Sequence, residues 1–453
     1  MGKNSQRRRA DNKNRVSVDP STLAPSSNEL TTEAIDQLIV VASYAALNTE
    51  HKNIFANAVR ALTNIEVGLA PARPSVLIAI RLQQCVSALF ENGWQPADVV
   101  HTIKRRCTIR ASRLTVAFIA ADSRRVDAVH RAPQQWLAQL DDIGAYDPVR
   151  GCIVGGHEHP FATWARSEKL DPDEMLSIGL HVLAELQVAP RMSALVAPPS
   201  AWTASNRGSL PQPPPAQIPQ GEVDAKALKL IRALLAKAEA TTFQAEAEAF
   251  TAKAQEMMTR HSIDAAVLAS AAAGGGRTRG IESRRVHIDS PYADEKADFL
   301  AVIADVNGAR SVWSPQVAIS TIMGFPIDLQ LTDLLFTSLL VQATHASAEE
   351  TSVDRGLRTP SFRRAFLIAF ADRVGERLEQ TRQRSSAAAT EQYGSSLLPI
   401  LADRTAAVSE TFAEAFPNLT KGKSRRLNAQ GWHAGRAAAD RAHIGAGEAI
   451  TAG

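Results

Sequence analysis

The chain is poor in the residues that hold small secreted proteins together or build structural metal sites. Its 453 residues include only Cys85, Cys107 and Cys152, and no two of these form a Cys-x-x-Cys pair. This scarcity argues against a disulfide framework and against a zinc site made of cysteines. We therefore expect a protein of a reducing compartment, the cytoplasm.

Long apolar runs and a secretory leader are also missing. The charges near the N-terminus are not followed by an apolar stretch, so no signal peptide is expected. No segment approaches the roughly twenty uninterrupted apolar residues of a transmembrane helix, so we expect no membrane association. Aromatic residues make up 5% of the chain and hydrophobic residues 45%, which favours closely packed helices over a large β-sandwich or barrel.

The common catalytic signatures are absent from the sequence. It has no Gly-x-Ser-x-Gly elbow, no Gly-x-x-x-x-Gly-Lys-Ser/Thr phosphate loop, and no Gly-x-Gly-x-x-Gly after a strand. We therefore assign no catalytic residue and expect no cofactor. The sequence favours a non-enzymatic protein, although missing motifs do not exclude an enzyme.

What the chain does contain is a mainly α pattern interrupted by two linkers. Residues 1–28 form a basic, polar tail that we expect to be disordered, and residues 29–196 form an N-terminal helical domain. A proline-rich linker (197–222) precedes a helical hairpin (223–270). A glycine-rich linker (271–280) then leads into a small α+β C-terminal domain (281–453) with a β-hairpin and long helices.

Caps and hydrophobic spacing predict several individual elements. A threonine caps the helix in "TTEAIDQLIVVASYAAL", and Pro96 stands at the first position of a later helix. "RRVHID" is a candidate strand, and "ARSVWS" with "VAISTIM" is typical of a β-hairpin. Thr359 and Pro360 start a long helix near the C-terminus.

The hairpin between the linkers has a narrow apolar seam. Its first helix aligns Leu228, Ile231, Leu234, Leu235 and Ala238, and its second aligns Phe243, Ala247, Phe250, Ala254 and Met257. Thr241 and Gln244 fit a capping box that starts the second helix. About forty residues cannot bury enough surface to be stable alone. The pair must dock, either on the rest of this chain or on a partner protein.

These residues also carry a family resemblance. "KLIRALLAKAEATTFQAEAEAFTAKAQEMMTRHSID", at about 224–264, resembles the bacterial family catalogued as domain of unknown function 2786. "SFRRAFLIAFADRVGERL" and "GWHAGRAAADRAHIG" resemble the segment that commonly follows this domain, and "LFENGWQPADVVHTIKRRC" resembles regions that precede it. The resemblance implies a helix pair and no activity.

One loop offers candidate metal ligands. "GCIVGGHEHP" contains Cys152, His157 and His159, whose thiolate and imidazoles suit zinc or another transition metal, and its glycines would let the loop wrap around an ion. The alternative is a polar surface turn. Likewise, His345 and Glu349 lie four residues apart on a predicted helix, where a solvated face is the simpler explanation.

Basic segments suggest nucleic acid as a partner. The first twenty residues carry six basic and two acidic side chains, a net charge of +4 in a chain of total charge +3, and include Arg7, Arg8 and Arg9. "HTIKRRCTIRASR" groups Lys104, Arg105, Arg106, Arg110 and Arg113 without an acid among them. Such groups bind phosphates in a salt-dependent, sequence-independent way. The alternative is a solvated face neutralised by acids from elsewhere in the fold.

Two further patterns bear on packing and on RNA. Gly431, Gly435 and Ala439 recur every four residues, which predicts a face for close helix packing. The helix–hairpin–helix from Lys296 to Glu350 is similar to part of several RNA-binding α/β modules. Those modules need a third strand and an aromatic platform or a Gly-x-x-Gly clamp, and only Trp313 could stack on a base.

The sequence thus favours a non-enzymatic cytoplasmic protein that associates with nucleic acid through its basic segments, or that docks a partner protein on the 224–264 helix pair. One alternative is a metal-dependent hydrolase that uses His157 and His159. A second alternative is a purely structural helical protein.

Overall fold

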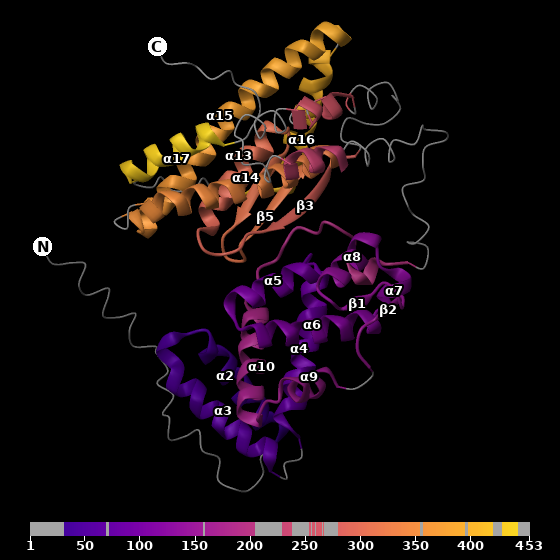
Figure 1. The fold of residues 1–453 in the computed structure, drawn as a ribbon. Coiled ribbons are helices and arrows are strands. Elements are labelled where there is room, and N and C mark those ends of the chain that lie inside the picture. The colour runs from indigo at the N-terminus through magenta and orange to yellow at the C-terminus, as the bar shows by residue number, and fades with distance from the viewer. Residues whose placement is uncertain are drawn as a thin grey trace, which may run out of the picture. The chain divides into compact units, whose positions relative to one another are not determined.

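A computed structural model gives the fold (Figure 1). It describes residues 31–68, 72–156, 159–203, 229–237, 253–254, 256–258, 260–264, 266, 280–353, 357–394, 397–419 and 428–442. Contacts divide the chain into two compact units. The first contains residues 1–90, 106–129 and 140–190, and the second contains residues 91–105, 130–139 and 191–453.

The described part of the first unit is mainly helical. Its principal elements are α2 (Thr32–Ala46), α3 (Lys52–Val67), α4 (Pro74–Glu91), α6 (Ile109–Arg125), α9 (Pro160–Glu168) and α10 (Pro172–Gln187). Helix α10 packs on α2, α3 and α6, and α6 packs on α9. Thr31 caps α2 through a hydrogen bond from Ala34 N, so the predicted threonine cap is confirmed.

The second unit combines a three-stranded sheet with long helices. In chain order it contains α5 (Pro96–Arg106), β3 (Glu282–His287), α13 (Ala293–Val306), β4 (Arg310–Ser314), β5 (Ile319–Gly324), α14 (Pro326–Val353), α15 (Pro360–Tyr393), α16 (Leu397–Ala415) and α17 (Ala429–Arg441). The strand order is β3-β5-β4, and both pairs are antiparallel. The predicted strand and the predicted hairpin are therefore confirmed, and they join in one sheet.

The two faces of this sheet have different neighbours. Val286, Ile322 and Trp313 lie on one face and pack against the apolar cluster of α13 and α14. Trp313 Nε1 also donates to Asp294 Oδ1 at 3.0 Å. Alternation along the strands places Arg285 and His287 on the opposite face. The sheet therefore has the third strand that RNA-binding modules need, but Trp313 lies on its helix-covered side and is no stacking platform.

Some elements carried too little local signal to be predicted. Two antiparallel two-residue strands, β1 (Tyr146–Asp147) and β2 (Cys152–Ile153), are too short to show a periodicity. Helices α3 and α16 and the short helices α7 (Ala128–Arg131) and α8 (Gln134–Asp142) were also not identified. No described helix is long and apolar enough to cross a membrane.

The helix pair packs into the core of the second unit. Residues 229–237 are helical, as are the described residues between 253 and 266. Ile231, Leu235, Ala254 and Met258 are buried in one apolar cluster with residues of α13, α14 and α15. The inward face predicted for the described part of the pair is therefore buried within this chain, as internal docking requires. Thr241, Gln244 and Phe243 lie outside the described residues.

Helix α17 packs against α15 (Figure 1). A Cβ atom on Gly435 would overlap the carbonyl oxygen of Phe366 and lie 3.0 Å from Ala369 Cβ, and one on Gly431 would overlap the carbonyl oxygen of Phe362. Asn428 caps α17 by accepting from Gly431 N at 2.9 Å. The packing face predicted from the four-residue repeat of small residues is thus confirmed.

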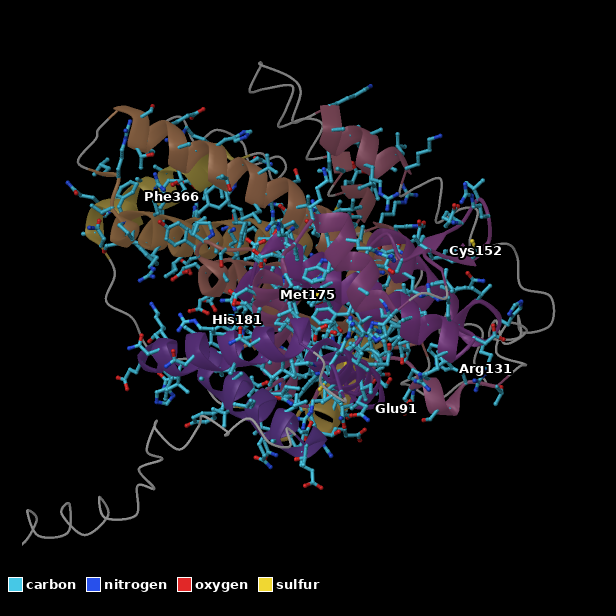
Figure 2. All side chains as sticks on the ribbon, turned by 90° about the horizontal axis from the view of Figure 1, so that it is seen from below. Glu91, Arg131, Cys152, Met175, His181 and Phe366 are labelled. Atoms are coloured by element: carbon cyan, nitrogen blue, oxygen red, sulfur yellow. The ribbon has the colours of Figure 1, made fainter. Side chains whose placement is uncertain are left out.

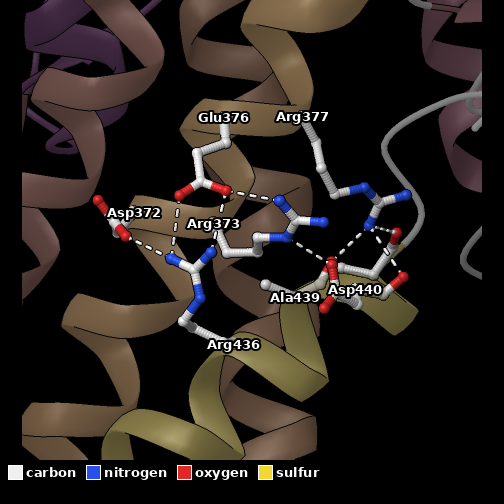
Figure 3. Close-up of polar contacts among 8 residues, drawn as sticks. Asp372, Arg373, Glu376, Arg377, Arg436, Ala439 and Asp440 are labelled. Atoms are coloured by element: carbon white, nitrogen blue, oxygen red, sulfur yellow. Dashed lines mark hydrogen bonds and ion pairs between the residues drawn. The ribbon is translucent and has the colours of Figure 1, made fainter.

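Charged side chains border this close approach (Figure 3). Arg436 of α17 donates to Asp372 Oδ2 at 2.7 Å and to both carboxylate oxygens of Glu376 at 3.0 Å. Arg377 of α15 donates to the carbonyl oxygens of Asp440 and Ala442, which end α17. These exposed pairs each contribute about 0–1 kcal/mol, so they orient α17 while the glycine contacts set its distance.

We predict that Gly435→Ala destabilises the second unit, although alanine is the better helix former by about 1 kcal/mol. The added methyl group has no space beside Phe366, and overpacking costs roughly 1–3 kcal/mol. Urea unfolding followed by circular dichroism measures the change. Ala437→Ser adds one atom on the exposed side of α17 and is the control, with an expected change within about 0.5 kcal/mol. Stabilisation by Gly435→Ala would contradict the close approach.

Candidate functional site

The basic residues around the end of α5 fall into two classes. Arg106 Nη1 lies 2.6 Å from Glu185 Oε2, and Arg113 Nη1 lies 2.9 Å from Glu168 Oε1. Arg110 lies 3.6 Å from Glu168 and 3.9 Å from Glu174. The charges of these arginines are therefore largely neutralised by acids of α9 and α10.

Lys104 and Arg105 form the second class. Both are exposed in the last turn of α5, and neither makes an ion pair with a described acid. The positive charge of Arg105 also helps to lower the pKa of His101, one turn earlier on the helix. These two side chains therefore present net positive charge to solvent. Arg7, Arg8 and Arg9 lie outside the described residues.

The candidate metal ligands are only partly described. Cys152 is exposed on β2 (Figure 2), and His159 is the residue before α9, where its side chain makes no capping hydrogen bond. His157 lies outside the described residues, so the predicted set stays a prediction. Among the residues that the structure does describe, no group of three or more His, Cys, Asp or Glu side chains could hold a metal ion.

A buried polar cluster in the second unit was not predicted. It starts at Asp98, in the first turn of α5, whose side chain is 1% exposed. Asp98 Oδ2 accepts from Gln95 N at 2.9 Å. Asp98 is the third residue of the helix, and its bond to the N-cap residue is the one that such a residue makes in a capping box. Gln139 supports the same helix start, since its amide donates to Gln95 Oε1 at 2.9 Å and its oxygen accepts from Ala97 N at 3.3 Å.

Arg285 of β3 is the main partner of Asp98. Its side chain is 2% exposed and pairs with Asp98 through Nη1. Its Nη2 atom donates to the carbonyl oxygens of Gly93 at 2.9 Å and Ser193 at 2.8 Å. One guanidinium thus holds the start of α5, the turn before it and the segment at Ser193. Gly93 has a φ of +87°, and a Cβ there would overlap the carbonyl oxygen of Met192.

Two histidines complete the cluster. His287 Nε2 lies 2.9 Å from Asp98 Oδ1, and the His287 ring stacks on that of His101, with centroids 4.7 Å apart. His101 Nε2 lies 3.2 Å from the carbonyl oxygen of Ala318 on the neighbouring strand, and its Nδ1 lies 4.0 Å from the exposed carboxylate of Asp289.

The electrostatics of this cluster favour charged Asp98 and neutral His101. Burial would raise the pKa of Asp98, but the hydrogen bond with His287 and the charge of Arg285 hold that pKa below its ordinary value. Burial and the neighbouring His287 lower the pKa of His101 to about 4. Every oxygen of Asp98 has a donor, so this carboxylate is engaged in holding α5 to β3.

A second buried carboxylate fastens the helix pair. Asp328, in the first turn of α14, accepts from Ser262 Oγ at 2.6 Å and from Arg404 Nη2 of α16 at 2.6 Å. The Arg404 guanidinium also lies 4.0 Å from the ring centroid of Phe325. Burial raises the pKa of Asp328, and Arg404 opposes that rise. Ser262 belongs to the pair, so this cluster joins three segments that are far apart in the sequence.

Sequence patterns could have identified the aspartate of each cluster but not its arginine partner. An acid two residues after Pro96 is a capping signal for Asp98, and Asp328 likewise follows Pro326. Nothing local identifies Arg285, which is 187 residues away from Asp98. Arg404 is 76 residues away from Asp328, and it belongs to a helix that was not predicted.

We predict that Asp98→Ala costs about 3–5 kcal/mol, because it leaves the Arg285 charge buried without a partner. The free energy of unfolding of the full-length protein, measured in urea, tests this. Asp289→Ala is the control, because that side chain is 79% exposed at the edge of the same cluster. Its expected cost is within about 0.5 kcal/mol. Equal effects of the two substitutions would contradict the role of Asp98 as the partner of the buried Arg285 charge.

We also predict that stability falls on acidification between pH 6.5 and pH 4. The pKa of His101 is about 4 in the folded protein and about 6.5 in the unfolded chain, so in this window the unfolded state binds the extra proton. The loss is roughly 1–3 kcal/mol after allowance for solvent screening. His101→Gln removes the titrating group and should flatten the profile, as measured by urea unfolding across this range. An unchanged slope in the variant would refute the prediction.

Comparisons with known proteins identify one part of the chain. Residues 226–265 match the family model described as "Protein of unknown function (DUF2786)". No curated protein and no solved structure matches the sequence. The matched residues are those of the helix pair whose inward face is buried in the second unit. The helix pair between the two predicted linkers is therefore similar to the DUF2786 family.

Proposed function

We propose that the protein associates with nucleic acid without catalysing a reaction, and that the last turn of α5 holds phosphate groups. The observation that carries this proposal is the exposed pair Lys104 and Arg105, which lacks acidic partners among the described residues. Because no acid among the described residues neutralises these two charges, an anionic polymer can do so at little desolvation cost.

The contrast within one short segment supports this assignment. Arg110 and Arg113 share Glu168, and Arg106 has Glu185, so a phosphate would have to displace a carboxylate there. Lys104 and Arg105 need no such exchange. The start of α5 is held by Arg285, so these side chains extend from a helix with a fixed base. Phosphates bound this way are recognised by charge and not by base sequence.

The basic tail adds a second, independent contribution to the proposal. Arg7, Arg8 and Arg9 are three of the six basic residues that give residues 1–20 a net charge of +4, whereas the rest of the chain carries about −1. A charged arm of this kind raises the rate and strength of phosphate binding without specificity. Separate variants of the tail and of α5 therefore distinguish an arm from a folded binding surface.

We predict that Lys104→Gln/Arg105→Gln weakens binding to a labelled oligonucleotide. Fluorescence anisotropy across a salt series, with single-stranded and duplex probes, measures the effect. Loss of two phosphate contacts should reduce the slope of log Kd against log salt by roughly 1.4–1.8.

The double variant Arg110→Gln/Arg113→Gln is the matched control, because it removes the same charge from arginines that are already paired. A smaller loss in the control supports a binding surface at Lys104 and Arg105. Equal losses would indicate only non-specific attraction by net charge. Binding that disappears when Arg7, Arg8 and Arg9 are all changed to Gln would reduce the function to the tail. No binding by the wild-type protein would contradict the proposal.

A further inference from the structure

The two halves of α15 have different surroundings. Its first half carries Phe362, Phe366, Phe370, Val374 and Leu378, all buried among the other elements of the second unit. After Leu378, no described side chain of α15 is buried. In Figure 1 this second half extends past the other labelled helices of the second unit, and α16 returns alongside it.

A groove of about 720 Å³ lies between this half of α15 and the start of α16. The α15 wall is formed by Arg382, Gln383, Ser386, Ala387, Thr390 and Glu391. The α16 wall is formed by Leu398, Leu401, Ala402 and Thr405. Leu398 is 53% exposed, so a large apolar side chain faces solvent at the groove. An exposed leucine in a groove between two helices indicates a surface for another helix.

The α15 wall is complementary to itself. If a second, antiparallel copy of α15 were related to the first by a twofold axis between Ser386 and Ala387, Arg382 of each copy would face Glu391 of the other. Gln383 of each copy would likewise face Thr390 of the other. Arg382 and Glu391 are nine residues apart, about 13 Å along the helix, and they carry opposite charges at the two ends of the wall. Glu391 makes no ion pair within the part of the chain that the structure describes, whereas Arg382 pairs with Glu379 of its own helix.

We propose that a second copy of this chain fills the groove, with the two α15 helices antiparallel and crossing at Ser386 and Ala387. Each Arg382 then faces Glu391 of the other copy, and each Gln383 faces Thr390. Residues four apart form the ridge that the commonest class of helix packing uses, and the small Ser386 and Ala387 side chains permit close approach at the centre. Leu398 and Leu401 of each α16 cover the sides of the crossing helices. The interface then contains four helices, two from each copy.

Self-complementarity is what selects a second copy over an unrelated helix. Twofold dimers use the same surface on both subunits, so each residue of the surface must find its match within the same set. All six α15 residues of the groove meet that condition, whereas an unrelated partner would impose no such symmetry. This inference does not depend on nucleic-acid binding.

The test is the mass of the full-length protein in solution, measured by light scattering after gel filtration over a range of concentrations. A dimer is expected for the wild type and a monomer for Leu398→Glu, which puts a charge into the apolar wall. Glu410→Arg, an exposed change on α16 outside the groove, should stay dimeric. A wild-type monomer throughout, or a Leu398→Glu protein that stays dimeric, would overturn the proposal.

Charge exchange tests the antiparallel register. Arg382→Glu places like charges opposite each other in its own dimer, and so does Glu391→Arg, so each variant alone should dimerise at least tenfold more weakly. A mixture of the two variants restores both opposite-charge pairs and should form a heterodimer of wild-type strength. The double variant Arg382→Glu/Glu391→Arg should also recover. Failure of both rescues would refute this register even if the wild type is dimeric.

Discussion

The buried ion pair between Asp98 and Arg285 is the interaction on which the organisation of the second unit depends. Both side chains are almost fully excluded from solvent, and the guanidinium also binds two backbone carbonyls. An apolar pair of the same size could stabilise the unit as well or better, because burying two charges costs most of what their attraction returns. The charges instead restrict how the two segments can pack. An arrangement that left Arg285 or Asp98 buried without its partner would cost far more free energy than one that left an apolar side chain poorly packed. The pair therefore fixes how α5 meets β3.

A similar buried aspartate–arginine pair holds the helix pair of residues 226–265. Asp328 occupies the first turn of α14, as Asp98 does in α5, and each takes an arginine from a distant segment. The difference is in the third partner, which is a serine of the helix pair for Asp328 and a histidine of the same sheet for Asp98. Through Ser262 and four buried apolar residues the pair becomes part of the core that α13, α14 and α15 build. A helix pair too small to be stable alone thus obtains its stability from this chain.

Prediction from the sequence succeeded where the signal was local. Thr31 and Thr359 both cap helices as expected, and the strand and hairpin patterns correspond to β3, β4 and β5. The close packing of α17 followed from the four-residue repeat of Gly431, Gly435 and Ala439. The polar clusters could not be predicted, because a capping aspartate has the same sequence pattern whether its second partner is water or a buried arginine. Nor could the strand order, since local patterns do not state which strand takes the centre. The linker-based domain boundaries and the metal ligands stay predictions.

Two exposed surfaces of the second unit carry the proposals made above. Lys104 and Arg105 extend from a helix whose start is fixed, and the groove of α15 and α16 extends from a helix whose first half is fixed. The positions of Lys104 and Arg105 therefore depend on how the start of α5 is held by Arg285. The most direct measurement is a double-mutant cycle of Asp98→Asn and Arg285→Gln by urea unfolding. We predict a coupling energy of about 1–3 kcal/mol, as direct partners show. A coupling energy near zero would contradict the central role of this pair.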